Sequence, residues 1–349
     1  MIFNNKLIIF FIFTFSLSCF MGCTKIEDPK REVSQIKTAT IKERAYNRYS
    51  CKFFNITLGH MLDLFNLTDV KYEEIKQKLG NDIQHIMTYE NGSRVIATEE
   101  EKGNLVEFQY IRNKKEDVYL YGDNFLSEEE CSKELDFMSS KEAEENCRKE
   151  LKRLGIVSDL MVESVYGINQ NYIMKMYAQA DGTGFGEKEN MTKEREAYQF
   201  RFQIACDGVP FSNKTISKGV LEYIGQPDIL ITYSIKGIEY FSMNMILDHL
   251  TPIGKAKLIS QQEAENIALK IHGQAEAEEE KGTIINTEIV YLRVPVKIKT
   301  GKGNQDLSEY ECIPCWQIDI QNKVTWDNTK KTELVTFTYL LQGDTGERL

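Results

Sequence analysis

The sequence predicts an α+β fold in which tandem units each pack one amphipathic helix on an antiparallel sheet. Two observations lead to this prediction. Segments with the same opening string and a helical pattern begin at Ser139 and Ser260, and apolar runs typical of strands follow both. The length of 349 residues suits two or three folded units, at about 150 residues each. Hydrophobic residues make up 42% of the chain, which is enough for sizeable cores.

The first predicted helix covers residues 139–156, which read SSKEAEENCRKELKRLGI. Its apolar stripe at helical spacing consists of Ala143, Cys147, Leu151 and Leu154. Ser139 and Glu142 form a capping box, in which a hydroxyl and a carboxylate satisfy otherwise unpaired backbone N–H groups. Gly155 is expected to end the helix.

The second predicted helix covers residues 260–273, SQQEAENIALKIHG, and repeats the S-x-x-E-A-E string of the first. Ser260 and Glu263 form its capping box, and Gly273 is expected to stop it. The apolar stripe consists of Ala264, Ile267, Ala268 and Ile271. Each helix therefore offers one face to a sheet.

Strand-like segments follow each helix. After the first come NYIMKMYAQ and AYQFRFQIACDG, and the second of these alternates apolar and polar residues as a strand with one solvated face does. A further strand-like run, ILITYSIKGIEYFSM, begins at Ile229. After the second helix come an alternating run over 290–298, a strand around Trp316 and ELVTFTYLLQG, with Asp344 in a turn. Helices followed by such strands favour antiparallel layers over parallel βαβ units.

The N-terminal segment predicts export. Leu7 to Gly22 is an uncharged run that is shorter than the roughly 20 apolar residues of a membrane span, so it is interpreted as a secretory signal peptide. The run ends in Phe20-Met21-Gly22-Cys23, which resembles the lipobox of bacterial lipoproteins. That resemblance implies lipid attachment at Cys23 and a lipid anchor on the outer face of the cell membrane. Cys19 is an alternative attachment site, and a plain signal anchor is an alternative to lipidation.

Six cysteines remain after the signal region, namely Cys51, Cys131, Cys147, Cys206, Cys312 and Cys315. They could form three disulfides in many connectivities, and the sequence does not choose among these. Cys147 and Cys206 continue apolar faces, so we expect them to be buried thiols. The pair Cys312 and Cys315 invites a redox interpretation. A period-two pattern follows it, however, and positions i and i+3 of a strand point to opposite faces.

Residues 258–349 resemble the PepSY-type units of Gram-positive exported proteins at three places: Ile259 to Ala264, Pro314-Cys315-Trp316 and Thr345-Gly346-Glu347. The tandem layout is similar to the membrane-attached YycI and YycH regulators, which restrain a sensor histidine kinase. The predicted organisation is a signal peptide (1–22), a lipidated N-terminus and tether (23–50), an N-terminal α+β domain (51–125), and two PepSY-like units (126–250 and 251–349).

Charge and motifs exclude several kinds of function. The net charge of −10, without a basic stripe, opposes binding to nucleic acid. His60, His85, His249 and His272 show no metal-ligand spacing, and we expect His60 and His249 to be partly buried and hydrogen-bonded. The glycines at 182, 184 and 186 do not complete a phosphate-binding motif. The sequence thus predicts no catalytic residue, metal ion or cofactor.

The expected function is that of a surface-exposed, membrane-anchored lipoprotein. It would act without catalysis, as a binding or regulatory module for an exported or membrane protein partner. Two alternatives remain open, a substrate-binding lipoprotein of a transporter and an extracellular enzyme. A binding module predicts a sheet face or edge that is apolar but uncovered.

Overall fold

The computed structural model describes residues 45–53, 56–100, 103–112, 131, 133–156, 159–179, 192–212, 216–218, 221–223, 229–244, 247–275, 282–295, 299–301, 304–306, 310–326 and 331–349. The predicted signal peptide, both candidate lipid-attachment sites Cys19 and Cys23, and the glycines at 182, 184 and 186 lie outside these residues. The described strands and helices all belong to one compact unit, Glu43–Leu349.

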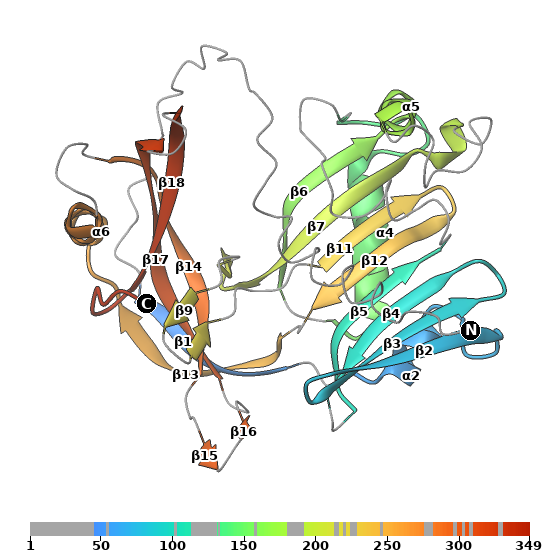
Figure 1. The fold of residues 1–349 in the computed structure, drawn as a ribbon, viewed down its shortest axis with the longest axis horizontal. Coiled ribbons are helices and arrows are strands. Elements are labelled where there is room, and N and C mark those ends of the chain that lie inside the picture. Colours follow the sequence, from blue (N-terminus) through green and yellow to red (C-terminus); the bar gives the residue numbers. More distant parts are fainter. Residues whose placement is uncertain are drawn as a thin grey trace, which may run out of the picture. The chain divides into compact units, whose positions relative to one another are not determined.

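A nine-stranded antiparallel sheet dominates this unit (Figure 1). Its order is β2-β3-β4-β5-β12-β11-β7-β6, with the short β8 paired to β7. The strands are β2 (Tyr72–Leu79), β3 (Asp82–Tyr89), β4 (Arg94–Glu99), β5 (Leu105–Ile111), β6 (Leu160–Ile168), β7 (Ala197–Cys206), β8 (Val209–Pro210), β11 (Ile229–Ser234) and β12 (Gly237–Asn244). The strands β2 and β6 therefore form the two edges of this sheet.

A second sheet has five strands: β1 (Ala45–Phe53), β13 (Leu247–Lys257), β14 (Thr283–Pro295), β17 (Tyr310–Trp326) and β18 (Lys331–Gln342). The long strand β17 pairs with β14 along one side. Along its other side it pairs first with β1 and then with β18. Two small hairpins complete the strands, β9 (Ile216–Lys218) with β10 (Leu221–Tyr223) and β15 (Lys299–Gly301) with β16 (Asn304–Asp306).

The helices of the described residues are α2 (Leu58–Leu64), α4 (Ser140–Arg153), α5 (Gln170–Gln179) and α6 (Gln261–Ala275), with a 3-10 turn η3 (Lys193–Arg195). Helix α4 packs on one face of the nine-stranded sheet, where it contacts β7 and β11, and α5 packs on the other face. Helix α6 packs on the five-stranded sheet. None of these helices is long and apolar enough to cross a bilayer.

The start of each predicted helix is confirmed. The Ser139 hydroxyl accepts the Glu142 N–H at 3.2 Å, and the Ser260 hydroxyl accepts the Glu263 N–H at 3.2 Å. Gly155 follows the last turn of α4 with φ of +79°, a left-handed conformation that ends a helix. The predicted stop at Gly273 is wrong, because α6 continues to Ala275.

The predicted fold class, tandem units of one helix on an antiparallel sheet, is wrong. Of the residues that the structure describes, 57% lie in strands, which are mostly antiparallel, and 21% lie in helices. The nine-stranded sheet joins strands from 72–111 to strands from 160–244 in one layer, and the five-stranded sheet begins with β1. Pairing between distant segments decides this architecture. Local periodicity reports the individual strands and not their partners.

One strand prediction after the first helix is also wrong. The segment NYIMKMYAQ is the helix α5, whose first turn is held by the Asn169 side chain accepting the Tyr172 N–H at 2.9 Å. The strand-like run from Ile229 is confirmed as two strands, β11 and β12, which pair as a hairpin with Ser234 opposite Gly237. The second face of β7 is not fully solvated. Gln199 on that face is buried, because α5 covers this side of the sheet.

A two-residue turn links the sheets. Asp207 and Gly208 connect β7 to β8 with φ of +53° and +74°, values expected of a type I′ turn. The Asp207 carboxylate accepts the Tyr49 hydroxyl at 2.7 Å and the Asn47 side-chain N–H at 2.8 Å, both from β1. Apolar residues of both sheets share one buried cluster around this point, so the two sheets have a common core.

Candidate functional site

The structure places the residues singled out from the sequence mostly in structural roles. Cys147 is buried in α4 and Cys206 at the end of β7, as predicted, and burial raises the pKa of both thiols. The expectation for His60 is wrong, because its side chain is exposed at the start of α2. The side chain of His249 lies outside the described residues.

The Cys312 and Cys315 pair lies on β17 with its side chains on opposite faces, as the strand pattern predicts. Cys312 belongs to the core shared by the two sheets, where it contacts the Cys51 thiol. Cys315 packs in a separate cluster with Val290 and Leu292. The register with β14 runs without a shift through Pro314, so no bend brings the two sulfurs together. Burial raises the pKa of both thiols, which disfavours the reactive thiolate.

His272 of α6 is the centre of a buried polar network between this helix and the five-stranded sheet. Its Nδ1 atom lies 2.8 Å from the Tyr339 hydroxyl and its Nε2 atom 2.6 Å from the Asn322 side-chain nitrogen. The imidazole is 2% exposed, and a hydrogen-bonded polar group so deeply buried fixes the position of the helix on its sheet. Among the described residues, no three His, Cys, Asp or Glu side chains gather as ligands of a metal ion.

The surface with the clearest potential for binding is the outer side of β2, which we call the β2 edge (Tyr72–Leu79). Within the described residues β3 is the only strand that pairs with β2. Seven of the eight residues of β2 are exposed. The apolar side chains are conspicuous, because Ile75 is 60% exposed, Tyr72 46% and Leu79 41%. An edge strand offers unpaired N–H and C=O groups to an incoming strand.

Charges along the β2 edge change sign at its middle. Glu73 and Glu74 precede Ile75, whereas Lys76 and Lys78 follow it. Glu74 is held in place, since its carboxylate lies 2.7 Å from His85 Nδ1 and 3.5 Å from Lys76 Nζ.

His85 anchors this arrangement from β3. Its imidazole is buried, and its Nε2 atom lies 3.1 Å from the Glu99 carboxylate on β4. Burial raises the pKa of Glu74, but the hydrogen bond with His85 and the charge of Lys76 outweigh it, so that the pKa lies below its usual value. Glu74 is therefore a fixed negative charge at neutral pH.

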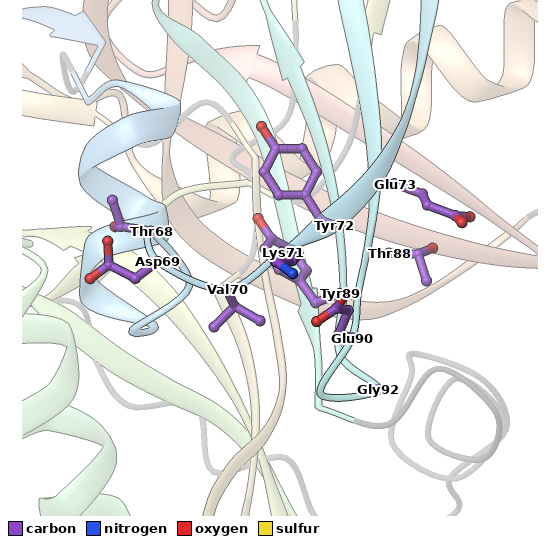
Figure 2. Close-up of a pocket in the computed structure, with 10 residues that line it drawn as sticks. All are labelled: Thr68, Asp69, Val70, Lys71, Tyr72, Glu73, Thr88, Tyr89, Glu90 and Gly92. Atoms are coloured by element: carbon purple, nitrogen blue, oxygen red, sulfur yellow. The ribbon is translucent and has the colours of Figure 1, made fainter.

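A hollow of about 800 Å³ opens at the first residues of the β2 edge. Figure 2 shows its lining, which comes from the loop before β2, from β2 itself and from the end of β3. The rings of Tyr72 and Tyr89 lie 5.2 Å apart there, and Lys71 and Glu90 surround them with charge. Aromatic rings beside charged side chains suit a side chain of a bound peptide.

Three of the other edge strands are less regular. The pairing of β2 with β3 shows no register shift. By contrast β6, β13 and β14 each contain a bulge, and β13 also contains Pro252. Bulges and prolines protect edges from added strands. In β18 the end of the strand is covered by the bridge between Leu341 and Arg348.

The sequence did not point to the β2 edge. Tyr72, Ile75 and Leu79 are spaced as on a helix, and the intervening residues are charged, so the apolar alternation of a strand is missing. One local signal was available, the two-residue turn Gly80-Asn81 between β2 and β3. Gly80 has φ of +65°, as the first position of a type II′ hairpin turn requires.

Comparisons with known proteins support the architecture alone. No family model matches this chain, and no curated protein matches it. A solved structure does. It is an uncharacterised protein from Eubacterium rectale with a TM-score of 0.59 and 14% sequence identity, over 87% of this chain and 86% of that one. The similarity shows that the fold occurs in another protein and carries no statement about function.

Proposed function

We propose that the protein is an exported lipoprotein, anchored through Cys23, that acts without catalysis by binding a protein partner through strand addition at the β2 edge. The observation that carries this proposal is the regular, exposed strand β2 at the end of a nine-stranded sheet. The resemblance of residues 258–349 to PepSY-type units is consistent with such a role.

Strand addition accounts for several features of the edge together. An extended segment laid along β2 would pair with its outward N–H and C=O groups. The same segment would cover Ile75 and Leu79, which are otherwise exposed to water. Its end would reach the hollow beside Tyr72, where a bulky side chain could enter. Main-chain pairing supplies affinity, and the hollow supplies selectivity.

Lipid attachment is the proposed means of anchoring. The net charge of −10 gives the protein no electrostatic attraction to anionic lipid head groups. Acyl chains contribute about 0.8 kcal/mol for each buried methylene, so two or three chains on Cys23 hold a protein firmly.

A Cys23→Ala variant tests the anchor. It is expected to lose labelling by radioactive palmitate and to leave the membrane fraction, whereas a Cys19→Ala variant keeps both properties. Continued labelling of the Cys23→Ala protein would reject this attachment site.

Position-specific crosslinking tests the β2 edge. A photoreactive amino acid replaces Ile75 in the full-length protein, in intact cells. The matched control carries the same group at Ile253, which is 49% exposed on the edge strand β13. We expect a protein adduct from position 75 and none from position 253. Equal labelling at both positions would mean that β2 is not a binding edge.

A further inference from the structure

We propose that the strand added to the β2 edge is β2 of a second copy of this chain, antiparallel and related by a two-fold axis at Ile75. This inference rests on the proposed function and names its partner. It follows from the order of charges along β2, from the regularity of the strand and from the side chains that the pairing would cover.

The order of charges makes β2 complementary to itself. The first half of the strand carries Glu73 and Glu74, and the second half carries Lys76 and Lys78. In an antiparallel pair, the first half of one strand lies opposite the second half of the other. A second copy therefore brings lysines to glutamates on both sides of the axis.

Electrostatics also selects the register. A two-fold axis normal to the sheet places one residue opposite its own counterpart. With Ile75 at the axis, Glu74 lies opposite Lys76 of the second copy, twice. With Glu74 at the axis two carboxylates face each other, and with Lys76 at the axis two ammonium groups do. Opposite charges across strands stabilise a pair and like charges destabilise it, so the Ile75 register is favoured.

The Ile75 register also covers exposed apolar groups. Ile75, 60% exposed in the single chain, packs against its own counterpart. On the other face, the Tyr72 ring lies opposite Lys78 of the second copy, where the aliphatic part of the lysine can cover it. A neighbouring strand brings side chains within contact distance on both faces.

Three other described edge strands, β6, β13 and β18, lack this complementarity. In β6, Glu163 is the only charged residue. In β13, bulges and Pro252 interrupt the strand between Asp248 and the lysines Lys255 and Lys257. In β18, the charged residues Lys331 and Glu333 both lie at the beginning of the strand, and no charged residue follows in its second half. The strand β2 therefore combines an unshifted pairing register with an acidic first half and a basic second half.

The expected association is weak in solution. One pair of eight-residue strands covers less surface than the roughly 1,000 Å² of a stable interface. Lipid anchors confine copies to one membrane, and such tethering raises the effective concentration to the order of millimolar. The dimer is therefore expected mainly on membranes, or at high protein concentration.

Charge reversal at two positions tests the pairing. In Glu74→Lys the two lysines face each other across the axis, and in Lys76→Glu the two glutamates do. Each variant is expected to dimerise about tenfold more weakly than the native protein, measured by sedimentation equilibrium at high protein concentration and low salt. An equal mixture of the two variants restores the opposite charges, and so does the double variant Glu74→Lys/Lys76→Glu.

The double variant separates pairing from folding. Glu74→Lys loses the contact with His85 and can lower stability, but Lys76→Glu keeps that contact. A defect caused by altered folding would persist in the double variant. Restored dimerisation in the mixture and in the double variant supports the inference. If all four samples associate equally, or none associates, the pairing is wrong.

An Ile75→Cys variant tests the register on membranes. With Ile75 at the axis, the two cysteines lie within the range that a disulfide can bridge. Mild oxidation of the full-length lipoprotein, with Cys131 replaced by Ser, is expected to give a reducible dimer of this chain. The Ile253→Cys control is expected to stay monomeric.

The identity of the crosslinked species separates this inference from the proposed function. A dimer of this chain supports both. An adduct of position 75 with a different protein overturns self-pairing and leaves strand addition standing. The absence of any adduct overturns both.

Discussion

One carboxylate, Asp207, joins β1 to the turn between β7 and β8. Its acceptance of the Tyr49 hydroxyl brings a consequence at high pH. Burial, and then the hydrogen bond to Asp207, raises the pKa of Tyr49 to about 12, from an ordinary value of 10.0. Burial likewise raises the pKa of Tyr198 to about 12. These side chains remain neutral in the folded protein where the unfolded chain already ionises.

The protein is therefore expected to lose stability as the pH rises from about 10 to 12. The contribution is complete below pH 10, because Tyr49 is then neutral in both states. Urea unfolding at pH 9 and at pH 11 measures the effect. A Tyr49→Phe variant should lose less stability between the two values than the native protein. An equal loss in both proteins would contradict this role of Tyr49.

The hydroxyl of Tyr339 is a hydrogen-bond partner of the buried His272. A Tyr339→Phe variant leaves that imidazole nitrogen without its partner and is expected to cost about 1–3 kcal/mol of unfolding free energy. Chemical denaturation measures the cost. The control is Tyr72→Phe on the exposed β2 edge, which should change stability little. Similar values for the two variants would mean that the network around His272 is not stabilising.

At the scale of elements, the N-caps are the features that the sequence predicted best. The capping serines of α4 and α6 make the expected hydrogen bonds because capping depends on residues three apart. Helix α5 was missed although Asn169 caps it, since its apolar residues also suit a strand. Short apolar runs do not separate the two kinds of structure.

Removal of the N-cap of α6 is expected to lower the stability of the protein. A Ser260→Ala variant loses the side-chain acceptor for the Glu263 N–H and is expected to cost about 0.5–2 kcal/mol. Urea unfolding measures the difference, with Gln262→Ala on the exposed side of α6 as control. If Ser260→Ala costs no more than the control, the cap does not stabilise α6.

Strand pairing marks the limit of what the sequence predicted at this scale. The strands around Phe200, Trp316 and Tyr339 were expected from alternation, and β7, β17 and β18 confirm them. Their partners were not predictable, because β17 pairs with β1, more than two hundred residues earlier in the chain. The strand β2 could not be predicted from the sequence either, for a related reason. A strand exposed on both faces has no apolar alternation to detect.

For the whole molecule, the shared core explains why tandem units are the wrong description. Tyr291 of β14 packs against Phe211, and its hydroxyl donates to the Asn47 carbonyl of β1. Side chains from the beginning, middle and end of the chain are thus buried together. Lipid attachment at Cys23 and the similarity to PepSY-type units stay predictions.

Hydrogen–deuterium exchange of the full-length protein tests whether the outer side of β2 receives another strand. Amides of residues 72–79 that point away from β3 are expected to exchange rapidly in dilute solution. They should become protected when the lipidated protein is concentrated on vesicles, while the amides of β6 stay unchanged. If the exchange of β2 is the same under both conditions, no strand adds there and the account is contradicted.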